Sequence, residues 1–329
     1  MRAIQIDEFG GSEKLIEKNI SIPIPNDDEV IVKIEFAGIN YMDVYMRNGS
    51  YAKSHTYQTP LPMTIGMEAS GTIYQLGKNV KNFKLNERVA YCLSRGSYAQ
   101  YAAVPAWRLV KIPDSIKSEQ AAALMLQGLT AHYLTNSAYE LKAGDSCLIH
   151  AGAGGVGQLA IQLAKIKGAT VITTVGSEEK AVVAKKLGAD HTILYKDVNF
   201  QDEVMRITKN NGVNVVYDSV GKDTIDQSIR CLQKRGLCVM FGASSGQVPG
   251  IAPLALAEAG SIYFTRPHLA DYIPNAEIIN ERMSEIFSLI SSGKLRNSIH
   301  AIYQLQDAKK AHDSLESRGT LGKFLLAIS

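Results

Sequence analysis

The chain has few cysteines and no motif that would pair them. Its four cysteines, Cys92, Cys147, Cys231 and Cys238, are scattered without a C-x-x-C pair. This argues against both a zinc ribbon and a disulfide framework. We therefore expect four buried, reduced thiols that act as small apolar side chains.

Strong net charge and long apolar runs are also missing. A net charge of +3 is too small to indicate a surface for nucleic acid or for an anionic membrane. No apolar stretch reaches the ~18 residues of a membrane span, and residues 1–7 contain an acid before any signal-peptide core could form. We expect a cytoplasmic protein without membrane or nucleic-acid partners.

A length of 329 residues suggests two domains, each large enough for its own core. The first third is β-rich, with strand candidates at residues 29–36, 68–74 and 88–92. Near Ser118 a capped helix begins, and helical composition continues towards Leu141.

Strands and helices alternate beyond this point. Amphipathic stretches such as residues 178–187 separate short apolar runs at residues 147–151, 170–175, 191–194, 213–217 and 237–241. This alternation predicts an α/β fold with a parallel, doubly wound sheet. A helix near residues 277–291 and strands at 299–303 and 324–328 follow, and we expect this ending to fold back onto the first domain.

The most informative stretch is a glycine cluster between a strand and a helix. Gly152, Gly154 and Gly157 follow the apolar run at residues 147–151 and open the helical stretch at 158–165. Glycines let the backbone turn tightly against phosphates, and a helix N-terminus supplies free N–H groups and partial positive charge. The pattern predicts a dinucleotide site.

The end of the second strand of this unit indicates which dinucleotide is bound. An Asp or Glu there would accept hydrogen bonds from the ribose hydroxyls and repel a 2′-phosphate. Here the strand runs into Gly176 and Ser177, and Lys180 follows, which favours NADP. Against this, Glu178 and Glu179 adjoin Lys180, and a lysine at a helix start is usually a solvated side chain.

The chain resembles the zeta-crystallin-like NADPH:quinone oxidoreductases, a zinc-free branch of the medium-chain dehydrogenase/reductase superfamily, and above all its bacterial members. The resemblance runs essentially from end to end. It is carried by the glycine cluster and by AGINYMDVY at 37–45, GMEASG at 66–71, MLQGLTA at 125–131, YDSVG at 217–221, FGASSG at 241–246, TRP at 265–267 and ESR at 316–318.

The resemblance implies a GroES-like catalytic domain at residues 1–124 and 266–329 and a Rossmann NADP-binding domain at 125–265. Zinc-dependent relatives place Cys where this chain has Asn40 and His where it has Met67. Neither replacement suits catalytic zinc, so we expect no metal. Glu68 is then expected to act as a structural or hydrogen-bonding carboxylate.

The resemblance also implies the site residues. Asn40, Tyr45 and Tyr51 would line the substrate pocket and donate hydrogen bonds to a developing oxyanion, although such tyrosines are often packing residues. The cofactor would be held by Gln127, Thr130, Gly154, Gly155, Val156, Gly157, Gly176, Ser177, Lys180, Tyr195, Ser219, Phe241, Gly242, Ser244, Ser245 and Arg318. Away from the resemblance, Phe241 would be ordinary core and Arg318 a surface arginine. His132, His150 and His268 are not embedded in a nucleophile or metal motif and are assigned no role.

The implied function is NADPH-dependent quinone reduction in the interdomain cleft, by hydride or single-electron transfer. One alternative is reduction of activated C=C bonds in 2-alkenals or enones. Another is a non-catalytic, crystallin-like role in binding NADPH or RNA. A homodimer is expected, paired at a sheet edge through the apolar segments at residues 237–241 and 261–264.

Overall fold

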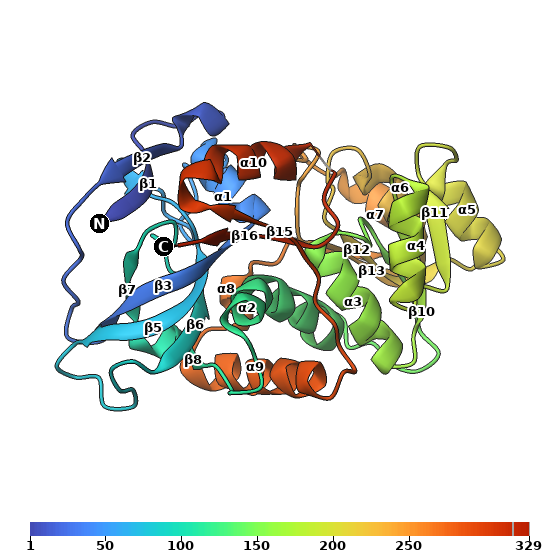
Figure 1. Cartoon of the computed structure of the whole chain (residues 1–329). Coiled ribbons are helices and arrows are strands. Elements are labelled where there is room, and N and C mark those ends of the chain that lie inside the picture. The colour runs from blue at the N-terminus through green and yellow to red at the C-terminus, as the bar shows by residue number, and fades with distance from the viewer. Residues whose placement is uncertain (318, 329) are drawn as a thin grey trace. The chain divides into compact units, whose positions relative to one another are not determined.

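The computed structural model describes residues 1–317 and 319–328, which fold into two compact units (Figure 1). The first unit is discontinuous in sequence and comprises Met1–Leu129 and Ile273–Ser329; the second comprises Thr130–Tyr272. The boundaries expected at 124/125 and 265/266 lie a few residues before these divisions. Among the described residues, no helix is both long and apolar enough to cross a membrane.

The first unit is built on two largely antiparallel sheets. The larger one orders its strands as β15 (Ile299–Gln304), β16 (Lys323–Ala327), β3 (Glu29–Ile39), β5 (Glu68–Leu76), β6 (Arg88–Cys92) and β8 (Val110–Lys111), with β7 (Tyr101–Pro105) also paired to β3. The smaller one orders β2 (Ile16–Asn19), β1 (Arg2–Ile6) and β4 (Met63–Thr64). The strands expected in the first third are confirmed.

The C-terminal strand completes the larger sheet. β16 pairs antiparallel with β3, so that Phe324 lies opposite Ile39 and Leu325 opposite Gly38. The chain therefore folds back onto its first domain as predicted. Because β3 is flanked by β5 on one side and by β16 and β7 on the other, its apolar residues are buried except for Phe36, which is half-buried.

Four helices accompany these sheets: α1 (Tyr41–Arg47), α2 (Ser118–Tyr133), α9 (Ala276–Ser291) and α10 (Ala308–Glu316). α2 begins at Ser118 as predicted but ends at Tyr133, where a π-helical turn, Leu134–Ala138, takes over. Helical backbone thus continues towards Leu141 as expected, as far as Ala138, with its last five residues in the π-helical turn. α9 begins where Asn275 accepts a hydrogen bond from the Ile278 amide.

The second unit contains the predicted parallel, doubly wound sheet. Its strand order is β11 (His191–Leu194), β10 (Thr170–Val175), β9 (Ser146–Ile149), β12 (Val213–Asp218), β13 (Leu232–Met240) and β14 (Tyr263–Thr265). Its helices are α3 (Gly155–Ile166), α4 (Glu178–Lys186), α5 (Phe200–Ile207), α6 (Ile225–Arg230), α7 (Pro253–Glu258) and α8 (Leu269–Tyr272) (Figure 1). Strand order reverses between β9 and β12, and dinucleotides bind outside the strand ends at such a point.

A continuous apolar core covers one face of this sheet. It joins Leu148, Ile172, Val216 and Cys238 of the strands to residues of α5, α6 and α7. All four cysteines are free and buried, as predicted. The strand expected at 147–151 extends two residues beyond the observed end of β9 at Ile149. The backbone turns at Ala151, where φ is 53°.

The expected pairing edge needs a correction. Only the second of the two apolar segments reaches it, since β14 is the edge strand and Tyr263 is 59% exposed. The segment at 237–241 belongs to β13, which is covered by β12 on one side and β14 on the other. Its apolar character therefore reflects a central strand.

Candidate functional site

The glycine turn has the shape that a pyrophosphate requires. A Cβ atom at Gly157 would collide with the Ala151 carbonyl oxygen, and one at Gly152 with the Thr173 hydroxyl. Gly154 precedes α3, and no side chain caps that helix. The first-turn amides of α3, which include those of Gly155, Val156 and Gly157, therefore lie at a strand end beside small residues, an arrangement that fits a dinucleotide phosphate.

The tips of β10 and β11 bring together the residues expected at the 2′-phosphate. The Tyr195 hydroxyl would lie 2.9 Å from a Cβ atom at Gly176. Ser177 caps α4 by accepting a 3.4 Å hydrogen bond from the Lys180 amide. Burial, and then the charge of Lys196, lower the pKa of the Lys180 ammonium.

Lys196 was missed by the sequence analysis. Its only signal in the sequence is its position directly after Tyr195 at the end of β11. Lys180 and Lys196 thus act on each other at the tips of β10 and β11, where Glu179 also acts on Lys180 and the β10 strand itself carries no acid.

The loops after β12 and β13 are interlocked. The Ser244 amide donates to the Ser219 carbonyl over 3.2 Å, and the Ser245 amide donates to that of Val220 over 2.9 Å. A Cβ atom at Gly242 would come within 2.6 Å of the Ser219 carbonyl oxygen. Ser219, Phe241, Gly242, Ser244 and Ser245 therefore lie together.

Two further expected cofactor residues lie on α2: Gln127 is half-buried and Thr130 is buried. Arg318 lies outside the described residues. That these residues contact a cofactor remains a prediction.

In the first unit, Asn40 belongs to a buried ionic cluster. The Lys323 ammonium donates to Asn40 Oδ1 over 2.6 Å and to Glu68 Oε2 over 2.5 Å. Asn40 Nδ2 donates to the same Glu68 oxygen over 2.8 Å. Glu68 and Lys323 are 0% and 2% exposed, so each charge has its counter-charge in place of water.

The remaining Glu68 oxygen accepts from the Leu126 amide over 2.5 Å, which confirms Glu68 as a hydrogen-bonding carboxylate. A Cβ atom at Gly38 would overlap this carboxylate. Sequence analysis missed Lys323, although a lysine that opens an otherwise apolar strand is a signal that it has a buried partner.

A second chain of buried polar groups starts beside Asn40. Asp43 Oδ2 accepts from the backbone amide of Asn40 over 2.8 Å and from the Tyr98 hydroxyl over 3.0 Å. His312 lies next, with Nε2 3.1 Å from the Tyr98 hydroxyl and Nδ1 3.0 Å from the Arg47 guanidinium. Because Arg47 can only donate, Nδ1 accepts and Nε2–H donates to Tyr98.

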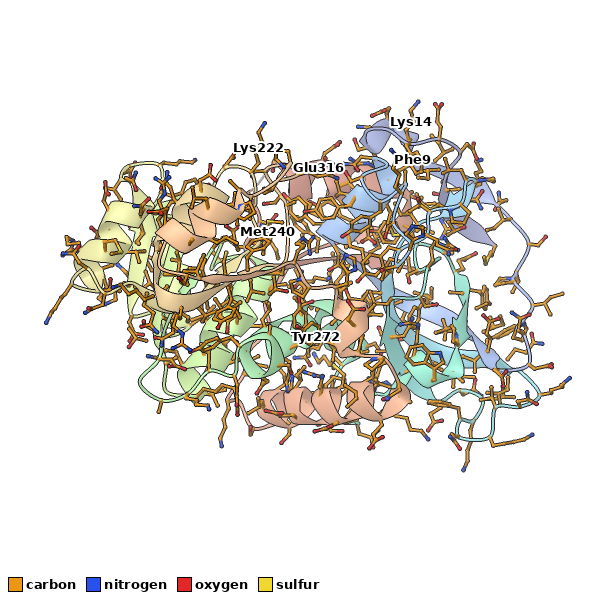
Figure 2. The ribbon with its side chains drawn as sticks, turned by 180° about the vertical axis from the view of Figure 1, so that it is seen from behind. Phe9, Lys14, Lys222, Met240, Tyr272 and Glu316 are labelled. Atoms are coloured by element: carbon orange, nitrogen blue, oxygen red, sulfur yellow. The ribbon has the colours of Figure 1, made fainter. Side chains whose placement is uncertain are left out.

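This chain of polar groups reaches the protein surface at the end of α10. Arg47 pairs with Glu316 over 2.8 Å, and Glu316 is seen there in Figure 2. Burial raises the pKa of the Asp43 carboxyl to about 7. Burial, followed by the charge of Arg47, lowers the pKa of His312 to about 3.

Tyr45 and Tyr51 are brought together in a row of aromatic rings. Their ring centroids are 5.4 Å apart in an edge-to-face arrangement, and Tyr41 and Tyr57 extend the row on either side. Such pairs are a favourable aromatic geometry. Their contact with a substrate remains a prediction.

Two domain families match the chain. The Alcohol dehydrogenase GroES-like domain matches residues 26–114, and the Zinc-binding dehydrogenase family matches residues 155–290. The fold is thus a GroES-like domain plus a Rossmann domain.

Full-length relatives narrow this further. Quinone oxidoreductase 1 of Escherichia coli is 41% identical over 98% of both chains. The chain belongs to the quinone oxidoreductase family. A crystal structure of the Escherichia coli quinone oxidoreductase complexed with NADPH matches with a TM-score of 0.95, covering 99% of this chain and 100% of that one. A 2-haloacrylate reductase from a Burkholderia species is 37% identical over 98% of both chains.

The buried ion pair of Glu68 and Lys323 allows a prediction about the free energy of unfolding of this quinone oxidoreductase family member. Glu68→Gln or Lys323→Met leaves one buried charge unpaired and is expected to lower the free energy of unfolding by about 3–5 kcal/mol. Glu68→Gln combined with Lys323→Met should recover most of that loss. Urea denaturation measures all three variants.

A matched control is Asp27→Asn, which breaks the pair between Lys78 and Asp27, whose side chains are 73% and 53% exposed. It should change stability by less than about 1 kcal/mol. Equal losses for the exposed and buried pairs would contradict the assigned role of burial.

Asp43 and His312 should give opposite pH dependences. The raised pKa of Asp43 means that its contribution to stability is lost as pH rises from its unfolded value of 3.8 to about 7. The lowered pKa of His312 means that its contribution is lost as pH falls from 6.5 to about 3.

Relative to the parent protein, Asp43→Asn should therefore gain stability as pH rises through this range, by up to ~1.4 kcal/mol per pH unit. His312→Gln should lose stability relative to the parent over the same rise. Urea unfolding at several pH values between these limits tests both variants, and curves parallel to that of the parent would refute the assignment.

Proposed function

We propose that this protein is an NADPH-dependent quinone reductase. The observation that carries the proposal is its full-length similarity to the Escherichia coli quinone oxidoreductase, whose structure holds NADPH. The glycine turn and the interlocked loops after β12 and β13 support the proposal, because close-packed glycines and uncapped first-turn amides suit a pyrophosphate.

NADPH rather than NADH is favoured by charge. Burial and then the charge of Lys196 lower the pKa of the Lys180 ammonium, while the charge of Glu179 acts in the opposite sense. A 2′-phosphate between the two lysines would be attracted by both ammonium groups, whereas a ribose hydroxyl would gain little. Ser177 and Tyr195 add hydroxyl groups at the same end.

The reaction is proposed to need no zinc. Asn40 and Met67 are poor zinc ligands, and the Lys323 ammonium bonded to Asn40 Oδ1 would repel a metal cation there. Among residues 1–317 and 319–328, no three His, Cys, Asp or Glu side chains form a group that could hold a metal. The donor set therefore does not fit the metal of the zinc-dependent relatives.

NADPH, when bound, supplies the hydride, and quinone with NADPH and one proton gives hydroquinone and NADP⁺. A conjugated quinone is already electron-poor, so positioning and a few hydrogen bonds can suffice. Tyr45 and Tyr51 are proposed to donate to the developing oxyanion. Asn40 is proposed to line the pocket with its side-chain amide held in place, since Nδ2 donates to Glu68 over 2.8 Å and to the Gly38 carbonyl over 3.5 Å and Oδ1 accepts from Lys323.

A second candidate is reduction of activated C=C bonds. It is favoured by the similarity to the Burkholderia 2-haloacrylate reductase, since an acrylate carries such a bond. A hydride acceptor of this kind also needs no metal when its carbonyl is conjugated. The substrate that is turned over distinguishes the two candidates.

Turnover should be measured as NADPH consumption with 1,4-benzoquinone, 9,10-phenanthrenequinone and a simple enone. We expect oxidation of NADPH with a quinone, weaker turnover with NADH, and no effect of a chelator. Lys180→Ala should raise the KM for NADPH about tenfold and leave that for NADH nearly unchanged. Lys185→Ala, on the exposed side of the same helix, is the control.

Turnover of the enone alone would favour the second candidate. Loss of activity with chelator would contradict the metal-free site, and equal effects of Lys180→Ala on both cofactors would contradict the phosphate contact.

We further propose a cytoplasmic homodimer with no nucleic-acid or membrane partner, paired through the edge strand β14. An exposed strand edge is a pairing liability unless it is covered. Light scattering should give twice the chain mass, and Tyr263→Lys should give the monomer. Ile302→Lys, at the 46% exposed Ile302 on the edge strand β15, is the matched control and should leave the dimer intact. A monomeric parent protein would overturn this proposal.

A further inference from the structure

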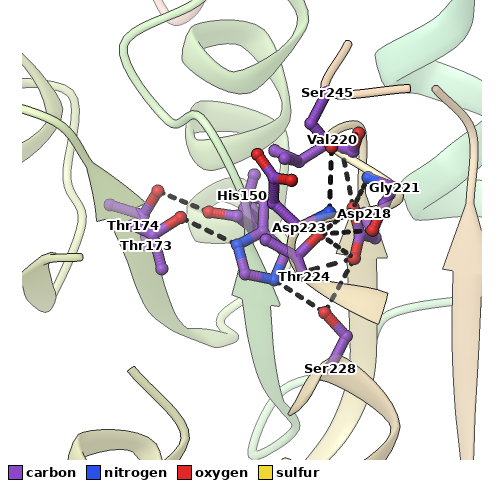
Figure 3. Close-up of polar contacts among 11 residues, drawn as sticks. His150, Thr173, Thr174, Asp218, Val220, Gly221, Asp223, Thr224, Ser228 and Ser245 are labelled. Atoms are coloured by element: carbon purple, nitrogen blue, oxygen red, sulfur yellow. Dashed lines mark hydrogen bonds and ion pairs between the residues drawn. The ribbon is translucent and has the colours of Figure 1, made fainter. Parts of the chain in front are cut away.

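A buried polar cluster at the ends of β9, β10 and β12 has no role in the function proposed above. His150, which follows β9, is 1% exposed and lies between two hydroxyl groups (Figure 3). Its Nδ1 is 2.8 Å from Thr174 Oγ1, and its Nε2 is 2.9 Å from Ser228 Oγ. Ser228 in turn donates to Asp218 Oδ2 over 2.7 Å.

The acceptor at one end fixes the direction of every bond in the cluster. Because the Ser228 hydroxyl donates its proton to Asp218, its oxygen accepts from Nε2–H of His150. Nδ1 is then unprotonated and accepts from the Thr174 hydroxyl. Burial lowers the pKa of His150, which agrees with this neutral tautomer.

The cluster is not a hydrolytic centre. In a nucleophilic serine site the histidine lies between the acid and the serine and takes the serine proton. Here the serine lies between the acid and the histidine, and His150, Asp218 and Ser228 are all buried. We conclude that these side chains hold backbone segments together.

Asp218 fixes the loop that follows β12. Its Oδ1 accepts from the amides of Val220 and Gly221 over 2.8 and 2.9 Å, and Thr224 donates its hydroxyl to Oδ2 over 2.8 Å. Ser245 extends the contacts to the loop after β13 by donating to the Val220 carbonyl over 2.8 Å. Lys222, in the same loop, is exposed and lies on the outside of it (Figure 2).

The other end of the cluster lies beside the proposed 2′-phosphate site. Thr174 precedes Val175, Gly176 and Ser177, and its carbonyl accepts from the Gly152 amide over 3.2 Å. One hydrogen-bonded path, from Thr174 through His150 and Ser228 to Asp218, therefore joins the adenosine side, the glycine turn and the nicotinamide-side loops.

We propose that His150, Ser228 and Asp218 are positioning residues that set the spacing between the two ends of the dinucleotide site. This inference rests on the proposed NADPH site. The cluster holds the loop at residues 218–224 at a fixed distance from the tip of β10, so that one extended cofactor can occupy both ends. Its loss should weaken the whole dinucleotide more than either half.

Calorimetric binding to the full chain tests this with NADPH and with adenosine 2′,5′-bisphosphate, which fills the adenosine end alone. Ser228→Ala and Thr174→Val should each weaken NADPH about tenfold. Ser228→Ala should leave the bisphosphate within about threefold of the parent, because that end does not depend on the β12 loop. Thr174→Ser keeps the hydroxyl that Thr174→Val removes, and it should bind NADPH with the affinity of the parent protein.

Thr208→Val is the matched control, because it removes a hydroxyl at the end of α5 in the same unit, which donates to the Val204 carbonyl and accepts from the Gly212 amide. It should leave both affinities unchanged. In the free protein, Ser228→Ala should also speed hydrogen exchange of the amides at residues 219–224, a readout that needs no cofactor.

Unchanged NADPH affinity in Ser228→Ala, or slow exchange at residues 219–224, would overturn the inference. An equal loss of affinity for NADPH and for the bisphosphate in Ser228→Ala would also overturn it, since the cluster would then shape the adenosine end alone. A parent protein that binds no NADPH would instead refute the proposed function.

Discussion

The buried pair between Glu68 and Lys323 is the constraint on which the first unit depends. Desolvating two charges is costly, and their attraction offsets the cost only when the geometry is good and the remaining polar atoms are bonded. Here the Glu68 carboxylate accepts from Lys323, Asn40 and the Leu126 amide. The pair thereby joins β5 to β16, two strands that are far apart in the sequence, and it also orients the side-chain amide of Asn40.

The neighbouring chain from Asp43 to Glu316 is less completely satisfied. Asp43 Oδ2 has two donors, while Oδ1 is buried without a hydrogen-bond partner. Burial therefore raises the pKa of this carboxyl although donors stand beside it. At the other end His312 is held neutral between Tyr98 and a guanidinium. The link between α1 and α10 thus contains Asp43 and His312, whose contributions to stability respond to pH in opposite directions. It is most stable at pH values where both side chains are neutral.

Local pattern predicted most of the fold and part of the site. Strand–helix alternation gave the doubly wound sheet, and the glycine cluster gave the turn before α3, since both depend on neighbouring residues. The partners of His150 are 24 and 78 residues away, and Lys323 is 255 residues from Glu68. No periodicity connects such pairs, so His150 had no predicted role and Lys323 was missed. The prediction that residues 237–241 lie at the sheet edge was wrong for a related reason. Apolar content does not reveal which strand is the edge strand.

In the proposed NADPH site, the two lysines at the tips of β10 and β11 would favour an anion before one binds. Burial, followed by repulsion from Lys196, lowers the pKa of Lys180 against the opposing charge of Glu179, so the ammonium form is held at a cost. A phosphate dianion would remove that cost and add charge-assisted hydrogen bonds. A ribose hydroxyl would do neither. The preference for a phosphorylated ribose would therefore have two sources: repulsion in the free protein that is relieved on binding, and contacts formed in the complex.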